Sequence, residues 1–296
     1  MKKKIIVTLF MLAAILAACA LTGCSSGKPL ENVALVKDNK YSCTFEDVKH
    51  DFVVCLPEKS KGAPLVILLH GSGQSADSFK DVTQFDKEAN ARGYAVCYVT
   101  GSINMKAGRN SVSWDYGRID ADFDDVGFIK ALVSYLCDEY SLDDDNVYAA
   151  GFSNGGFMNF RLALEAQDTF KACVSVAGDL CKTLWNKRPE KNDISFMEIY
   201  GEKDESMPKN FDGSAGSALD PAIEDVMEYM ASSNGLGLQS EESFGKGSLI
   251  QKYGSDSDGD IVWSVLVGGI KHAWPTEEDG GLSTNKLILD FYESVK

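Results

Sequence analysis

The sequence contains few basic residues and few histidines. Its 296 residues include 29 Lys and Arg against 44 Asp and Glu, which gives a formal net charge of −15, and only three His. A nucleic-acid-binding protein needs a basic surface for the phosphate backbone, so this composition argues against a nucleic-acid partner. No group of Cys and His has the spacing of a zinc site, and no glycine-rich phosphate loop occurs. We therefore expect neither a metal nor another cofactor.

Long apolar runs are also scarce, and the one that is present lies at the N-terminus. Lys2, Lys3 and Lys4 precede an apolar run from Ile5 to Ala20, and small residues follow it. Residues 1–23 therefore have the charge and hydropathy pattern of a signal peptide. No later segment approaches the about 18 apolar residues that a membrane helix needs. We expect the body of the protein to act outside the cytoplasm.

The segment Leu21-Thr22-Gly23-Cys24 resembles the lipoprotein box of bacteria. The resemblance implies that Cys24 is acylated on its sulfur, becomes the new N-terminus and anchors the protein to a membrane surface. A plain secretory signal with an incidental Cys is the alternative. We expect residues 24–40, which continue with Ser25-Ser26-Gly27, to form a flexible tether.

Disulfides can form in a compartment outside the cytoplasm. Six cysteines follow the tether residue Cys24, and these are Cys43, Cys55, Cys97, Cys137, Cys173 and Cys181. Cys43 and Cys55 lie symmetrically about Lys49 in two strand-like runs, which makes them candidates to face each other across a hairpin. Cys97 and Cys173 lie within apolar runs, where buried free thiols are equally expected.

Short apolar runs alternate with helical patterns in the rest of the chain. Hydrophobic residues make up 44% of the sequence, which suits a globular protein, and we expect a single domain over residues 41–296. The runs predict buried strands at Leu65–Leu69, Ala95–Val99, Val147–Ala150, Ala172–Val176, Ser195–Tyr200 and Ile261–Val267. Helical spacing predicts helices over residues 126–140, 157–167 and 288–295. The alternation predicts an α/β fold with a doubly wound, mostly parallel sheet and with Tyr41–Leu56 as an antiparallel hairpin at one edge.

A serine within Gly151-Phe152-Ser153-Asn154-Gly155 follows one predicted strand and precedes a predicted helix. The Gly-x-Ser-x-Gly pattern places a nucleophile on a sharp strand-to-helix turn, where side chains two residues to either side have no room. Short glycine patterns also arise by chance, and a structural serine in a glycine-rich turn is the alternative. The flanking strand and helix favour Ser153 as a nucleophile.

A serine hydroxyl needs a base to become reactive, and the three histidines are the candidates. His50 lies in the predicted edge hairpin, and His70 ends a predicted strand. His272 follows the last predicted strand, in a loop that contains Gly and Pro. In hydrolases with such a serine turn, the acid and then the histidine come after the serine in the chain. We therefore expect His272 to be the base.

The acid that orients the base is expected at the end of a strand between the serine and the histidine. Asp204 fits, because Gly201-Glu202-Lys203-Asp204 follows the strand predicted at Ser195–Tyr200. Asp179 follows the preceding strand and is the alternative.

An oxyanion hole requires two backbone N–H groups aimed at the developing negative charge. Asn154, the residue after the nucleophile, is expected to supply one of them. The loop His70-Gly71-Ser72-Gly73 leaves a buried strand and resembles the second arm, with Ser72 as the expected donor. A plain glycine turn is the alternative for this loop.

These motifs together resemble the α/β-hydrolase group that contains polyhydroxybutyrate depolymerases, feruloyl esterases and acetylxylan esterases of carbohydrate esterase family 1. The resemblance is carried by Leu65–Asp77, Asp124–Ile129, Gly151–Met158, Gly201–Asp204, Asn234-Gly235 and His272–Pro275, which span almost the whole predicted domain. The sequence departs from the pattern at Ile270 and Lys271, where the family more often has glycine before its histidine. The resemblance implies an α/β-hydrolase fold and a serine esterase.

We therefore expect a lipid-anchored serine esterase that hydrolyses an ester through an acyl-enzyme. Only residues 177–194 separate two predicted strands at the place where caps are commonly inserted, so we expect little or no cap and an open groove. Trp114 and Trp274 are the candidate aromatic walls for a phenolic acid or a sugar ring. The expected substrates are feruloyl or acetyl esters of plant cell-wall polysaccharide. The alternatives are a polyhydroxybutyrate depolymerase, a serine peptidase and a noncatalytic binding lipoprotein.

Overall fold

A computed structural model describes residues 28–103, 112–118, 124–209, 220–245, 247–255 and 259–295. The expected signal peptide, residues 1–23, and the expected lipidation site, Cys24, lie outside these ranges. Within them, no helix combines the length and the apolar composition that a membrane crossing requires.

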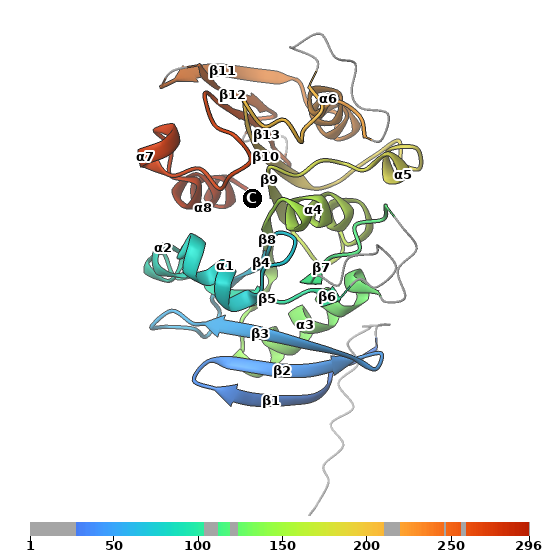
Figure 1. The fold of residues 1–296 in the computed structure, drawn as a ribbon, viewed down its shortest axis with the longest axis vertical. Coiled ribbons are helices and arrows are strands. Elements are labelled where there is room, and N and C mark those ends of the chain that lie inside the picture. Colours follow the sequence, from blue (N-terminus) through green and yellow to red (C-terminus); the bar gives the residue numbers. More distant parts are fainter. Residues whose placement is uncertain are drawn as a thin grey trace, which may run out of the picture.

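One sheet runs through the whole molecule, with helices on both of its sides (Figure 1). In the described ranges it has eleven strands, in the order β1-β2-β3-β5-β4-β8-β9-β10-β13-β12-β11. The bounds are β1 Glu31–Lys37, β2 Lys40–Phe45, β3 Val48–Cys55, β4 Pro64–Leu69, β5 Ala95–Val99, β8 Asp143–Phe152, β9 Ala172–Val176, β10 Ser195–Gly201, β11 Leu238–Phe244, β12 Ser248–Tyr253 and β13 Val262–Val267. The short strands β6 Ser102–Ile103 and β7 Val112–Ser113 pair separately. Strands β5, β4, β8, β9, β10 and β13 are parallel neighbours, and antiparallel strands flank them on both edges.

Helices cover the two faces of the sheet and close two separate cores. The bounds are α1 Ala76–Thr83, α2 Phe85–Ala91, α3 Asp125–Tyr140, α4 Asn154–Glu165, α5 Lys182–Trp185, α6 Ile223–Ser233, α7 Glu277–Gly280 and α8 Thr284–Ser294. Helices α1, α2 and α8 pack on one face, and α3, α4 and α6 pack on the other (Figure 1). Burial on both faces explains why β5 is a continuous apolar run and why β4 is one from Leu65 to Leu69. The structure confirms the predicted α/β-hydrolase type of fold, with the short helix α5 in the interval between β9 and β10.

Both edges of the sheet differ from the prediction. The residues of β1 were expected to belong to the tether of residues 24–40, but Glu31–Lys37 pair with β2, so the folded part begins before residue 41. At the opposite edge, β11 and β12 form an antiparallel hairpin that the sequence analysis did not anticipate. Most residues of β1 and β11 are exposed, so neither strand provides the buried apolar run on which the strand predictions rest.

The expected pairing of Cys43 with Cys55 is wrong. In the β2–β3 hairpin the partner of Cys43 is His50, because the turn falls at Glu46-Asp47. Cys43 and Cys55 also belong to the cores on opposite faces of the sheet. All six cysteines in the described ranges are buried free thiols. Burial raises the pKa of Cys43 and of Cys55 to about 12, so both remain protonated at neutral pH.

Candidate active site

Loops at the carboxyl ends of four parallel strands carry the expected site residues. Ser153 follows β8, Asp204 follows β10 and His272 follows β13, while Ser72 lies in the loop after β4. The carboxyl ends of parallel strands lie at one edge of the sheet, where open α/β sheets bind their ligands. Side chains that are distant in the sequence therefore meet in one place.

Ser153 occupies the strained turn that the glycine pattern predicts. Its backbone has φ 53° and ψ −116°, a conformation that residues with a Cβ rarely adopt. The turn is held on the β9 side by the Ser153 N–H, which donates to Val176 O at 2.8 Å. A Cβ on Gly151 would clash with Gly155 O, and a Cβ on Gly155 would clash with Leu69 O. Both glycines are therefore required by close backbone contacts.

The structure brings Ser153, His272 and Asp204 into one chain of hydrogen bonds. His272 Nε2 lies 2.8 Å from Ser153 Oγ, and His272 Nδ1 lies 2.7 Å from Asp204 Oδ2. The Asp204 carboxyl is fully buried, whereas the imidazole remains partly exposed. Burial alone would raise the pKa of Asp204, but hydrogen bonds from His272 and Ser206 outweigh burial and hold that pKa below its usual value. Asp204 is therefore ionised next to the imidazole.

The alternative acid, Asp179, has no hydrogen bond to Ser153, His272 or Asp204. Its Oδ1 accepts a hydrogen bond from Leu180 N at 2.7 Å, and its Oδ2 has no hydrogen-bond partner among the described residues. Burial raises the pKa of Asp179 well above its usual value. Burial thus favours the protonated form of Asp179, and the structure places Asp204 beside the base.

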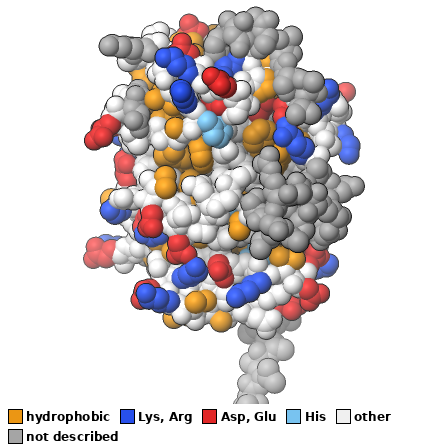
Figure 2. Space-filling view, in the orientation of Figure 1, with side chains coloured by type: hydrophobic (Ala, Val, Ile, Leu, Met, Phe, Trp, Pro, Cys, Tyr) orange, Lys and Arg blue, Asp and Glu red, His pale blue; other side chains and the backbone are white. Residues whose placement is uncertain are grey.

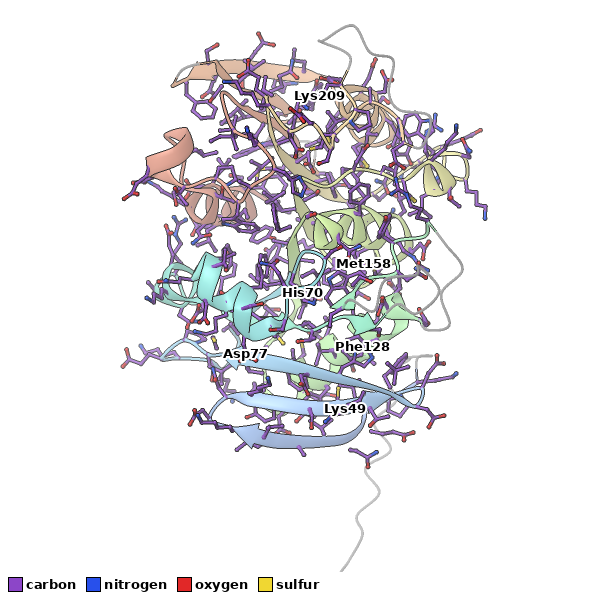
Figure 3. All side chains as sticks on the ribbon, in the orientation of Figure 1. Lys49, His70, Asp77, Phe128, Met158 and Lys209 are labelled. Carbon is purple, nitrogen blue, oxygen red and sulfur yellow. The ribbon has the colours of Figure 1, made fainter. Side chains whose placement is uncertain are left out.

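The loop from Asp204 to Lys209 holds the acid through contacts that the sequence analysis missed. Ser206 donates two hydrogen bonds to Asp204 Oδ1, from its N–H at 2.9 Å and from its Oγ at 2.5 Å. The buried Lys209 ammonium donates to the backbone carbonyls of Asp204 and Met207 (Figure 3). An aspartate that accepts from the N–H two residues later is an Asx turn, so the spacing of Asp204 and Ser206 was the signal available in the sequence.

Two backbone N–H groups flank the nucleophile and are free to bind an oxyanion. The N–H groups of Ser72 and Asn154 have no acceptor among the described residues, and both residues line the same cleft as Ser153. The Asn154 side chain accepts a hydrogen bond from Trp114 N at 2.6 Å, which fixes the start of α4. Helix N-termini favour negative charge, so the arrangement suits an oxyanion between Ser72 and Asn154.

His50 and His70 are buried, and their hydrogen bonds are to backbone groups and not to Ser153. Burial lowers the pKa of each to about 4, so both rings are neutral at physiological pH. His70 Nε2 accepts from Gly101 N at 3.0 Å, and its Nδ1 lies 2.7 Å from Gly71 O. Gly71 is therefore held from the side away from the cleft.

A cleft of about 550 Å³ opens in front of Ser153. One pale-blue histidine reaches the surface on the face shown in Figure 2, with hydrophobic side chains beside it. The aromatic rings of the cleft are Tyr116 and Phe157, whose centroids lie 4.9 Å apart at an interplanar angle of 42°. The Arg118 guanidinium lies 5.7 Å from the Tyr116 centroid and forms an ion pair with Asp220.

Trp114 and Trp274, the expected aromatic walls, do not line this cleft. Trp114 is 1% exposed, and its Nε1–H donates to His70 O at 3.0 Å, so the ring is part of the core beneath the site. Trp274 turns away from His272, since it packs edge-on against Phe79 of α1 and donates to Asn285 of α8 at 3.0 Å. The assignment of either tryptophan as a substrate wall is therefore wrong.

Sequence comparisons find similarity to esterases over part of the chain. The family described as Esterase PHB depolymerase matches residues 52–197. The putative esterase NocK of Nocardia uniformis subsp. tsuyamanensis is 37% identical over 169 residues, which are 56% of this chain and 47% of the relative. Feruloyl esterase B of Piromyces equi is 31% identical over 124 residues, which are 42% of this chain and 22% of the relative. This chain thus matches less than half the length of each of these two curated relatives.

A solved structure supports the same fold. The acetyl xylan esterase from Aspergillus awamori superposes with a TM-score of 0.59 at 12% identity, and the match covers 83% of this chain and 94% of that chain. The solved structure shows the α/β-hydrolase type of fold, and residues 52–197, just under half of the chain, resemble the Esterase PHB depolymerase family.

Proposed function

We propose that this protein hydrolyses carboxylic esters through an acyl-enzyme on Ser153. The observation that carries the proposal is the hydrogen-bond chain from Ser153 Oγ through His272 to Asp204, with distances of 2.8 and 2.7 Å. Beside it lie two backbone N–H groups, of Ser72 and Asn154, that have no acceptor in the part of the chain that the structure describes. A hydroxyl, a base, an acid and an oxyanion site are the groups that acyl transfer requires.

The reaction proceeds in two halves with the same groups. Ser153 Oγ attacks the ester carbonyl while His272 Nε2 takes the serine proton, and the N–H groups of Ser72 and Asn154 stabilise the oxyanion. Collapse of this intermediate breaks the bond to the alcohol, which leaves with the proton from His272. Water then attacks the acyl-enzyme with His272 again as the base, and the carboxylic acid is released as Ser153 is restored.

Replacement of the nucleophile tests this mechanism. Ser153→Ala should lower kcat for p-nitrophenyl acetate by about 10³-fold or more, with an unchanged circular dichroism spectrum. A phosphonylating inhibitor should add one adduct to the wild type and none to the variant. Turnover near the wild-type rate in Ser153→Ala would show that another residue attacks. An inactive wild type would favour a noncatalytic binding lipoprotein.

We further propose that the acyl group is a planar phenolic acid esterified to plant cell-wall polysaccharide. Support comes from the half-buried rings of Tyr116 and Phe157 in the cleft of Ser153, and from the similarity of residues in this chain to a feruloyl esterase. A stacked aromatic pair gains about 0.5–1.5 kcal/mol beyond simple burial. An acetyl group offers no ring for this contact.

The loop that carries Tyr116 is anchored firmly enough to act as a wall. Asp115 N donates to Asp125 Oδ2 at 2.6 Å, and Arg161 of α4 donates to both the carbonyl and the carboxylate of Asp115. Trp114 N donates to the side chain of Asn154. Tyr116 is therefore fixed relative to the nucleophile helix, which supports a preorganised subsite.

Substrate comparison tests the phenolic assignment. Methyl ferulate, acetylated xylan and hydroxybutyrate oligomers should be compared by kcat/KM, with methyl ferulate expected to be the best. Tyr116→Ala and Phe157→Ala should each lower the ratio of kcat/KM for methyl ferulate to that for p-nitrophenyl acetate by about 2- to 12-fold. A preference for the oligomers, with an unchanged ratio in both variants, would favour a polyhydroxybutyrate depolymerase.

We also propose that Cys24 carries a lipid anchor and that the enzyme works at a membrane surface outside the cytoplasm. The proposal is supported by the sequence Leu21-Thr22-Gly23-Cys24 after the apolar run. Cys24→Ala should move the protein from the detergent phase to the aqueous phase in a phase-partition experiment with expressing cells, and Cys43→Ala serves as the control. Unchanged partition of Cys24→Ala would contradict the anchor.

A further inference from the structure

Ser206 contacts both the acid and the base of the proposed site. Its Oγ lies 2.5 Å from Asp204 Oδ1 and 3.0 Å from His272 Nδ1. Its backbone N–H also donates to Asp204 Oδ1. A side chain that touches both partners of the His272–Asp204 hydrogen bond is in a position to set the geometry of that bond.

The chemistry of these groups fixes the direction of each hydrogen bond. The Asp204 carboxylate only accepts, so the Ser206 hydroxyl donates its proton to Oδ1. The hydroxyl oxygen then turns its lone pairs toward His272 and accepts from an N–H at Nδ1. Nδ1 thus faces two acceptors, Asp204 Oδ2 at 2.7 Å and Ser206 Oγ at 3.0 Å. A neutral imidazole with its proton on Nδ1 has an unprotonated Nε2, which here faces Ser153.

Ser206 also fixes the rotation of the carboxylate. Both of its donors bind Oδ1, which leaves Oδ2 directed at His272. The Ser206 side chain is exposed at the wall of the cleft, so it fills no core space. Its contacts are therefore polar and directed at the proposed acid–base pair.

We propose that Ser206 is a positioning residue that holds the Asp204 carboxylate and the Nδ1–H form of His272 in place for proton transfer. This inference rests on the ester hydrolysis proposed above. When His272 takes the Ser153 proton on Nε2, the ring becomes positively charged, and Ser206 Oγ then gives Nδ1–H a second acceptor beside the carboxylate. The stabilisation grows with the charge on the ring, so it acts on the rate of the chemical step.

The test compares Ser206→Ala with Ser206→Thr in the full-length protein. Ser206→Ala removes the hydroxyl and should lower kcat for p-nitrophenyl acetate by about 10- to 100-fold, with KM changed by no more than about twofold. Ser206→Thr keeps the hydroxyl at an exposed position, where the added methyl has space, and should retain most of the wild-type kcat. The thermal unfolding midpoints of both variants should match the wild type.

Proton NMR supplies a readout that does not depend on turnover. The His272 Nδ1–H should give a low-field resonance in the wild type and in Ser206→Thr. In Ser206→Ala this resonance should move upfield, and in Asp204→Asn it should vanish. A merely structural serine would not change this signal without also changing the unfolding midpoint.

The outcomes separate this inference from the proposed function. An active wild type whose kcat and low-field resonance are unchanged in Ser206→Ala would overturn the role of Ser206 and leave ester hydrolysis standing. Equal losses of kcat in the Ala and Thr variants, with lowered unfolding midpoints, would also overturn it. If the wild type hydrolyses no ester, the proposed function fails, and the response of the resonance to Ser206→Ala still decides whether Ser206 holds the His272 tautomer.

Discussion

His70 Nδ1 lies 2.7 Å from the carbonyl oxygen of Gly71, the next residue in the chain. Since His70 Nε2 accepts from Gly101 N, the neutral ring carries its proton on Nδ1 and donates it to Gly71 O. The peptide between Gly71 and Ser72 is planar and trans, so its N–H points away from its carbonyl. A buried imidazole thus directs the proposed oxyanion donor toward the cleft.

Replacement of His70 should therefore damage turnover more than substrate binding. His70→Phe removes the donor to Gly71 O and should lower kcat for p-nitrophenyl acetate by about 10²-fold, the typical cost of one oxyanion donor. His50→Phe is the matched control, because His50 is equally buried but lies in β3 and stacks on Phe128. We expect the control to lower the unfolding midpoint while keeping kcat. Equal losses of kcat in both variants would show a general packing effect.

The two buried aspartates should respond differently to the same substitution. Asp204→Asn removes the charge that stabilises protonated His272 and should lower kcat by about 10³-fold or more. Asp179→Asn replaces a carboxyl whose protonated form is favoured by burial and which has no hydrogen bond to His272, so it should change kcat little. Steady-state kinetics on p-nitrophenyl acetate at neutral pH measures both effects. A larger loss of kcat in Asp179→Asn than in Asp204→Asn would identify Asp179, in the loop after β9, as the acid that orients His272.

Asp125 should make the folded protein less stable as the pH rises. Burial raises the pKa of Asp125 from 3.8 to about 7, so the folded state keeps a proton that the unfolded state releases. The stabilisation is complete below the unfolded pKa and is lost as the pH rises from about 4 to about 7, at about 1.4 kcal/mol per unit. The amide in Asp125→Asn is neutral at every pH, so this variant should not lose stability in this way.

Urea unfolding at several pH values between 4.5 and 7.5 checks the contribution of Asp125. The free energy of unfolding of the wild type should fall relative to that of Asp125→Asn as the pH rises. Parallel curves for the two proteins would show that the Asp125 carboxyl has the same pKa in the folded and unfolded states.

Trp274 should contribute to stability and not to substrate choice. Trp274→Ala removes the edge contact with Phe79 and the hydrogen bond to Asn285, and it should lower the free energy of unfolding by on the order of 2 kcal/mol. The ratio of kcat/KM for methyl ferulate to that for p-nitrophenyl acetate should equal the wild-type ratio. A selective loss of kcat/KM for methyl ferulate in Trp274→Ala would show that Trp274 contacts the substrate.

The central strands were predictable from sequence because their burial is visible in short apolar runs of the chain. Leu65–Leu69, Ala95–Val99 and Ala172–Val176 are apolar on both faces, since helices cover both sides of those strands. Strands β1 and β11 are mostly exposed, and each is ordered by pairing with the neighbouring strand. Such pairing leaves no periodic signal in the sequence.

The site residues likewise divide into those that the sequence predicts and those that only the folded structure shows. Ser153, Asp204 and His272 follow from chain order and turn chemistry, and the structure brings them together. The direction of an aromatic side chain depends on tertiary neighbours, and proximity in sequence misled the prediction for Trp274. Its ring packs against Phe79 and hydrogen-bonds Asn285, whereas His272, two residues earlier, hydrogen-bonds Ser153 and Asp204. Tyr116 and Phe157 were missed because only the folded chain shows which rings face the cleft.

The contact between Gly155 and Leu69 O joins the start of α4 to the end of β4, and no side chain separates the two backbones. The nucleophile turn and the oxyanion loop are therefore parts of one rigid unit, held by the central strand pair β4–β8. Separation of the two parts requires breaking that central pair, which belongs to the most buried region of the sheet. Amide hydrogen exchange at the turn should consequently proceed through global unfolding, and heat inactivation should coincide with loss of the sheet.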